Sequence, residues 1–112
     1  MGRRRANDRR QRLGAGPPPP TVPDDPVEAL VARARRLRAR GDVRHALSLL
    51  RQACALDDWR PRTFTLLGVQ LAREGHHDEA ARALAQARWL RARAGDRARA
   101  DATERLAARL LP

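Results

Sequence analysis

Apolar residues recur three and four positions apart from residue 27 onward, the spacing that places side chains on one face of an α-helix. The first such segment has Leu30, Ala34 and Leu37 on one face, and four more segments follow it. The pattern therefore predicts five helices. The later apolar stripes are Ala46, Leu49, Leu50, Ala53 and Leu56; Phe64, Leu67, Gly68 and Leu71; Ala80, Ala83, Leu84, Ala87 and Leu90; and Ala98, Ala102, Leu106 and Leu110.

Local signals mark where these helices begin. Asp25 stands at an N-cap position, with Pro26 at the first helical position and Glu28 three residues after the cap, which together predict a capping box. Pro61 is expected to open the third helix, and the fourth is expected to begin near Asp78. The other caps are expected at Asp42 and Asp96, each after a glycine, and capping explains most of these acidic side chains without any chemistry.

The first 26 residues show no helical periodicity. They contain six arginines, from Arg3 to Arg12, and then a run of four prolines from Pro17 to Pro20. This composition predicts a disordered basic arm followed by a stiff polyproline spacer. The chain is therefore expected to divide into a tail, residues 1–26, and one helical domain, residues 27–112.

Composition supports an all-α fold. The 112 residues include 22 Ala and 24 Arg but no Lys, and only three aromatic residues, so the β-branched and aromatic residues that strands favour are scarce. The single cysteine, Cys54, excludes an internal disulfide, and no apolar run approaches the roughly 18 residues that span a bilayer. A cytoplasmic protein without a membrane partner is expected.

The helical region contains an internal repeat. Residues 27–60 and 61–94 align with a shift of 34, and seven of the 34 aligned pairs are identical. The shared glycines fall at the turns between paired helices, while the shared Ala and Leu fall on the apolar stripes, where small and large residues alternate for close helix packing. The identical pairs are Leu37/Leu71, Gly41/Gly75, Ala46/Ala80, Leu50/Leu84, Gln52/Gln86, Ala53/Ala87 and Leu56/Leu90.

A 34-residue helix-turn-helix unit resembles the tetratricopeptide repeat. The second unit matches the structural positions of that family from Phe64 and Leu67-Gly68 to Ala87. The first unit departs from the pattern, because Arg33 stands where the family has Leu, and the closing proline is absent from both units. The resemblance implies a short right-handed α-solenoid of two helix pairs, residues 27–60 and 61–94, with a C-terminal cap helix, residues 95–112.

The resemblance also implies a function. In this family the first helix of each pair lines an inner groove that binds peptide segments of other proteins, so a non-enzymatic adaptor is expected. The groove would be basic, which suits an acidic or extended peptide because Arg pairs bidentately with carboxylates. Val31 and Arg35 occupy two places where chaperone-binding members carry Lys or Asn, so that family's carboxylate clamp is not expected here. The implied groove residues are Val31, Arg35, Arg38, Arg62, Thr65, Val69 and Arg73.

Two other modes of binding stay open. The net charge of +11 attracts phosphate at low salt, so the basic tail is an alternative route to nucleic acid or the ribosome, although few groups are available to read bases. Fewer than three full repeats leave the ends of the stack exposed, and a homodimer would cover them. A tail that only increases solubility is a further alternative.

Candidate chemistry is sparse. The segment from His76 to Glu79 has metal-binding residue types, but adjacent histidines at a helix start point in different directions, so no metal site is expected. His45 and Cys54 lie on opposite sides of one helix, and Cys54 is expected to be a small packing residue. The sequence therefore predicts no catalytic residues and no cofactor. Trp59 and Trp89 are expected to pack between the helix pairs.

Overall fold

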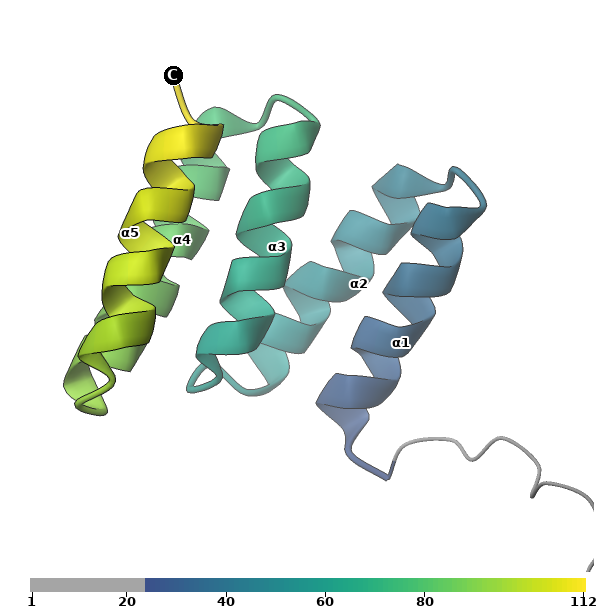
Figure 1. Cartoon of the computed structure of the whole chain (residues 1–112). Helices are drawn as coiled ribbons and strands as arrows, with labels where there is room; N and C mark the ends of the chain where they lie inside the picture. Colours follow the sequence, from purple (N-terminus) through teal and green to yellow (C-terminus); the bar gives the residue numbers. More distant parts are fainter. Residues whose placement is uncertain (1–23) are drawn as a thin grey trace, which may run out of the picture.

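The computed structural model describes residues 24–112, and these residues form five helices without a strand (Figure 1). The predicted all-α class is therefore confirmed. The expectations for the basic arm and the polyproline spacer fall almost entirely on residues 1–23, which lie outside the described residues. The helices are α1 (Pro26–Ala39), α2 (Val43–Leu56), α3 (Pro61–Arg73), α4 (His77–Arg93) and α5 (Arg97–Leu110).

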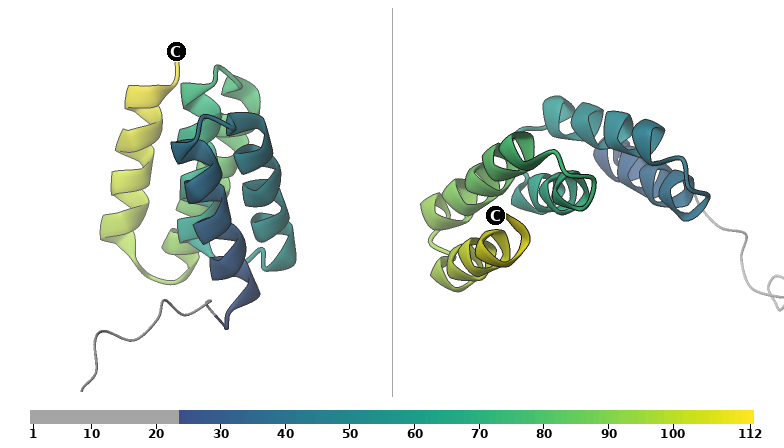
Figure 2. Two further views of the ribbon diagram at one scale, coloured as in Figure 1. Left: turned by 90° about the vertical axis from the view of Figure 1, so that its right-hand side faces the viewer. Right: turned by 90° about the horizontal axis from the view of Figure 1, so that it is seen from above.

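Each helix packs against the one that follows it in the chain. The α1–α2, α3–α4 and α4–α5 contacts are extensive, whereas the α2–α3 contact that joins the two helix pairs is smaller. Seen from above, α2 and α4 form one row, while α1, α3 and α5 form a second row beside it (Figure 2). The first helices of the two pairs, α1 and α3, therefore lie in the same row.

The aspartate caps predicted at Asp25, Asp42 and Asp96 are confirmed. Asp25 accepts a hydrogen bond from the amide two residues later, Val27, at 2.9 Å. Asp42 and Asp96 each accept one from the amide three residues later, at 3.3 and 3.1 Å. The fourth helix begins at His77, close to the predicted start near Asp78, but its N-cap is His76, so Asp78 does not cap it. Asp78 instead lies in the first turn, where its negative charge interacts favourably with the helix N-terminus.

The turn between paired helices is built identically in both units. Gly41 and Gly75 have φ angles of 86° and 82°, a region that costs glycine little and other residues much. The amide of the following residue then donates to the Leu37 or Leu71 carbonyl at 2.9 Å, which satisfies the helix end. This shared turn explains why the two units have the same residues at Leu37/Leu71 and Gly41/Gly75.

The predicted stripes of α1 to α4 form most of the core. Leu71, Ala80 and Leu84 are completely or almost completely buried, whereas Phe64 is only partly buried. Leu56 departs from the prediction, because it is the last residue of α2 and is 56% exposed, while its repeat equivalent Leu90 is buried. Leu90 lies on α4, which has α5 packed against it.

The stripe predicted for α5 is wrong in its first half. Ala98 and Ala102 are exposed, and Ala100 and Thr103 are buried instead. The Thr103 hydroxyl donates to the Arg99 carbonyl and accepts from the Arg91 guanidinium, both at 2.7 Å, so this polar side chain is satisfied inside the fold. Burial of that guanidinium lowers the pKa of Arg91.

Arginine side chains also join the two helix pairs. Arg51 of α2 makes a bidentate contact with Glu79 of α4 at 2.7 and 2.8 Å. Arg60, at the start of α3, contacts Asp25 at 2.6 Å and Asp57 at 2.8 Å, which fastens the beginning of α1 to the α2–α3 connection. Part of the arginine excess is therefore used in ion pairs between helices.

These contacts predict that stability decreases in acid. The hydrogen bond from Arg51 lowers the pKa of Glu79 below its ordinary 4.5, and the hydrogen bonds from Arg60 lower the pKa values of Asp25 and Asp57 below 3.8. A lowered carboxyl pKa stabilises the fold above the ordinary value, and this contribution disappears as pH falls through the folded value. We expect the melting temperature to fall as the pH is lowered below about 4.5.

The Glu79→Gln variant is expected to show a smaller fall over that range than the unmodified chain, when both are melted by circular dichroism. The difference should correspond to well under about 1 kcal/mol, because both side chains of the pair are partly exposed. Glu104→Gln is a matched control, because Glu104 meets Arg88 only at 3.6 Å and its side chain is more exposed than that of Glu79. Equal acid sensitivity in all three proteins would contradict the role of Glu79.

Candidate functional site

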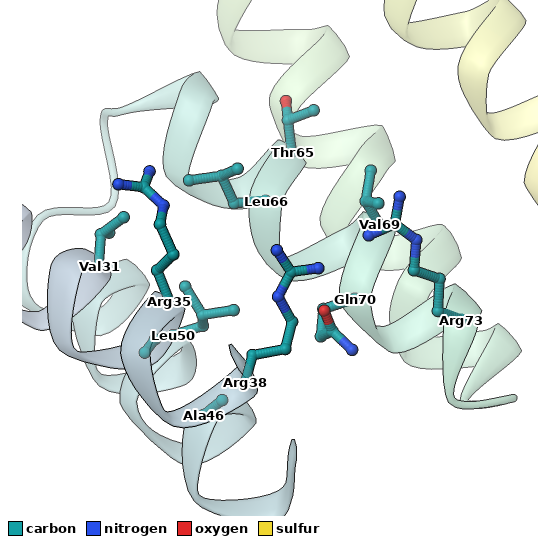
Figure 3. Close-up of a pocket in the computed structure, with 11 residues that line it drawn as sticks. Val31, Arg35, Arg38, Ala46, Leu50, Thr65, Leu66, Val69, Gln70 and Arg73 are labelled. Carbon is teal, nitrogen blue, oxygen red and sulfur yellow. The ribbon is translucent and has the colours of Figure 1, made fainter. Parts of the chain in front are cut away.

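A hollow of about 250 Å³ lies between α1, α2 and α3 (Figure 3). We name it the α1–α3 groove, since most of its lining comes from those two helices. It occupies the junction of the two helix pairs, where the α2–α3 contact is small. Its lining residues are Val31, Ala34, Arg35, Arg38, Ala46, Leu50, Thr65, Leu66, Val69, Gln70 and Arg73.

The inner surface of the groove is apolar. Ala34 of α1 and the Ala46 and Leu50 side chains of α2 are buried, and Val31 is only 4% exposed. Leu66 and Val69 complete the apolar surface on the α3 side. All of these side chains except Val69 belong to the packed core or lie against it, so most of the apolar surface is held in place without a ligand.

Three guanidinium groups surround this apolar surface. Arg35 and Arg38 lie three residues apart on α1, and Arg73 lies at the end of α3 (Figure 3). All three are exposed, and within residues 24–112 none of them forms an ion pair. No Asp or Glu lines the groove. Arginine stays charged at any physiological pH, so the opening of the groove is positive.

Two neutral polar side chains complete the lining. The Thr65 hydroxyl donates to the Pro61 carbonyl at 2.9 Å, a bond within its own helix. Gln70 is buried, and its amide donates to Glu74 at 3.1 Å. Glu74 follows Arg73 in the chain, so one carboxylate lies next to the groove although it does not line it.

The structure brings together six of the seven residues that the sequence assigned to the groove. Arg62 is the exception, because its guanidinium contacts both carboxylate oxygens of Glu28, at 3.2 and 3.3 Å. It lines a second hollow, of about 530 Å³, at the first turn of α3. The six residues that share the α1–α3 groove are Val31, Arg35, Arg38, Thr65, Val69 and Arg73.

Sequence reasoning missed part of the lining. Leu66 and Gln70 fall at helical spacing with Val69 and Arg73, so the 3.6-residue period contained the signal for them. Ala46 and Leu50 were assigned to the core alone. They are buried core residues and also the bottom of the groove, a double role that depends on how far apart α1 and α3 lie.

The two tryptophans contact each other across the two helix pairs, but neither is buried between the pairs as packing residues would be. Trp59 is 64% exposed and Trp89 is 49% exposed. Their ring centroids lie 6.3 Å apart with a 44° angle between the planes, and the Arg93 guanidinium lies 5.4 Å from the Trp89 ring centroid. The pair therefore forms an aromatic contact on the surface, where Trp59 of the α2–α3 connection meets α4.

The predicted packing role of Cys54 is confirmed. The side chain is buried, and burial raises the pKa of its thiol to about 11, so it is protonated at neutral pH. His45 lies near Asp42, with 3.6 Å between its Nδ1 and the carboxylate. Over residues 24–112, no three His, Cys, Asp or Glu side chains come together in an arrangement that could hold a metal ion.

The sequence matches no protein-family model, and no curated protein is significantly similar to it. None of the helices between residues 24 and 112 has both the length and the hydrophobicity that a membrane-spanning helix needs. The geometry of the α1–α3 groove is therefore the basis for a proposed function.

Proposed function

We propose that this chain is a tetratricopeptide-like interaction module that binds an acidic, extended segment of a partner protein in the α1–α3 groove. The main support is that a firmly packed apolar surface lies beside three exposed arginines. These arginines have no acidic partner among residues 24–112. An apolar hollow with a few convergent charges is the usual form of a binding site.

The repeated turn supports the solenoid part of this proposal. Leu37-to-Gly41 and Leu71-to-Gly75 form the same hydrogen-bonded helix end, 34 residues apart. Helix pairs that repeat in sequence and stack side by side present the first helix of each pair on one surface. The α1–α3 groove lies on that surface, and α5 would then be the helix that covers the last pair.

The shape of the groove indicates the form of the ligand. A volume of about 250 Å³ is too small for a folded element and suits one or two side chains. An extended peptide would place an apolar side chain over Ala46 and Leu50, with acidic side chains on either side. Its carboxylates would then reach Arg35 and Arg38 on α1 and Arg73 on α3, each as a charge-assisted hydrogen bond.

The other binding modes receive less support. Nucleic-acid binding through the tail depends on residues outside the described part of the chain, and the arginines between residues 24 and 112 do not gather on one helix. No aromatic side chain lines the groove, so it lacks the aromatic rings on which single-stranded nucleic acid stacks its bases. A non-enzymatic adaptor is therefore the function that we propose.

A titration with a model peptide tests the proposal. The full-length chain, labelled with nitrogen-15, is titrated with an eight-residue peptide that alternates Glu and Leu, and separately with the Lys and Leu equivalent. We expect the acidic peptide to bind with a dissociation constant on the order of 10 to 100 μM at low salt, since exposed ion pairs are individually weak. Amide shifts should concentrate on α1 and α3 around the groove.

The binding should also weaken as salt is raised, because the arginines are exposed. Equal binding of the acidic and basic peptides, or shifts that concentrate away from the α1–α3 groove, would refute the proposal.

A further inference from the structure

The surface contains an apolar cluster that the proposed groove does not use. Leu56, Trp59 and Trp89 are the only large apolar side chains among residues 24–112 that are strongly exposed. We name Trp59 and Trp89, with their ring centroids 6.3 Å apart, the tryptophan pair. Neither ring lines the α1–α3 groove. Two adjacent exposed indoles in a chain with three aromatic residues suggest a binding surface.

The tryptophan pair lies at the end of the molecule where the chain enters the fold. The start of α1, the α2–α3 connection and the end of α4 all lie at this end (Figure 1). Arg60 follows Trp59 directly, and its guanidinium contacts Asp25 at 2.6 Å. The described part of the chain therefore begins close to the tryptophan pair.

The preceding segment has the chemistry to cover these rings. Pro17 to Pro20 stand five to eight residues before Asp25. A run of four prolines favours the polyproline II conformation, which advances about 3.1 Å per residue, so these prolines reach roughly 16 to 25 Å from Asp25. Trp59 is one residue from Arg60, which Asp25 contacts, so the pair lies within this reach.

Proline-rich segments are recognised in proteins by surfaces lined with aromatic side chains, against which the pyrrolidine rings pack. The two indoles are in contact with each other and are 64% and 49% exposed, so together they form a continuous aromatic surface on which proline rings could pack. A proline run loses little conformational entropy on binding, and a segment of the same chain is present at a high effective concentration. Even a weak contact would therefore be populated.

We propose that Pro17–Pro20 packs against Trp59 and Trp89 of the same chain. The contact would hold the arginine-rich segment that precedes the prolines at this end of the molecule. It does not depend on peptide binding in the α1–α3 groove, so either proposal can fail without the other.

Intrinsic fluorescence provides a direct test, because the chain has two Trp and no Tyr, and both Trp belong to the pair. The full-length chain is compared with a variant that carries Pro17→Ser, Pro18→Ser, Pro19→Ser and Pro20→Ser. We expect the variant to show red-shifted emission and acrylamide quenching that is about twofold stronger, since the proline run no longer covers the rings. The matched control, Arg3→Gln with Arg4→Gln and Arg5→Gln, changes the tail but keeps the prolines and should behave like the unmodified chain.

Two single-tryptophan forms, Trp59→Phe and Trp89→Phe, show whether each ring is protected. These positions are exposed, so the substitutions should leave the circular dichroism spectrum and melting temperature unchanged. Unchanged quenching in the four-serine variant would overturn the proposal. Protection that persists in that variant and increases with protein concentration would also overturn it, because a second copy would then cover the rings.

Discussion

Reversal of two groove charges, Arg35→Glu with Arg73→Glu, is expected to weaken binding of an acidic peptide by about 30- to 150-fold. Each substitution replaces an attraction by a repulsion, at about 1 to 1.5 kcal/mol per site for exposed charges. The two residues lie on different helices and line the same groove, so both act on one ligand. Fluorescence anisotropy with the labelled Glu and Leu peptide measures the change.

The neutral pair Arg35→Gln with Arg73→Gln should fall between the unmodified chain and the reversed one, since attraction is lost without repulsion. A matched control, Arg97→Glu with Arg105→Glu, produces the same change of net charge on α5, away from the groove. If the control weakens binding as much as the groove variant, the effect comes from overall charge and the groove assignment is wrong. All four positions are exposed, so unfolding should not complicate the comparison.

Most of the helical architecture follows from local patterns in the sequence. The Asp25, Asp42 and Asp96 caps and the Gly41 and Gly75 turns involve residues a few positions apart, so their signals are local. The buried face of α5 was predicted incorrectly because alanine fits an exposed or a buried position equally well. The burial of Thr103 depends on Arg91 from another helix, a contact that periodicity does not contain.

The groove was predictable to the extent that it follows helix periodicity. Arg35, Arg38 and Arg73 could be placed on the correct helix faces, whereas Arg62 was misplaced because its partner belongs to the other helix pair. Glu28 stands 34 residues before Arg62, so the two occupy equivalent repeat positions. Opposite charges at equivalent positions of the two repeats predict an ion pair. That ion pair directs the Arg62 side chain toward Glu28 and away from the groove.

The exposed tryptophans show a related limit. Trp59 has Arg93 as its repeat equivalent, and both contact Trp89. A large aromatic residue after a helix predicts packing, since burial of an indole is favourable. Whether a neighbouring helix covers the ring depends on the separation of the helix pairs, which is set by many contacts at once. The sequence therefore predicts that Trp59 and Trp89 pack against other residues, but it does not predict that both rings are exposed.

The second large effect concerns the contact between α3 and α4. Leu84→Ala is expected to lower the free energy of unfolding by about 3 kcal/mol, because Leu84 is buried and its removal leaves a cavity. Gly68 faces this side chain, and a Cβ at residue 68 would stand 2.6 Å from Leu84 Cγ and 2.8 Å from Leu84 Cδ2. Gly68→Ala is expected to cost about 1 to 2 kcal/mol, since overpacking exceeds the gain in helix propensity.

The double variant, Gly68→Ala with Leu84→Ala, should lose at least about 1 kcal/mol less than the sum of the two single variants. The shorter side chain at residue 84 removes the clash, and the added methyl group at residue 68 occupies part of the cavity. Urea unfolding followed by circular dichroism measures all three variants, with Leu56→Ala as an exposed control that should change stability by about 0.5 kcal/mol or less. Additive losses would show that α3 and α4 approach each other less closely at Gly68 than the structure indicates.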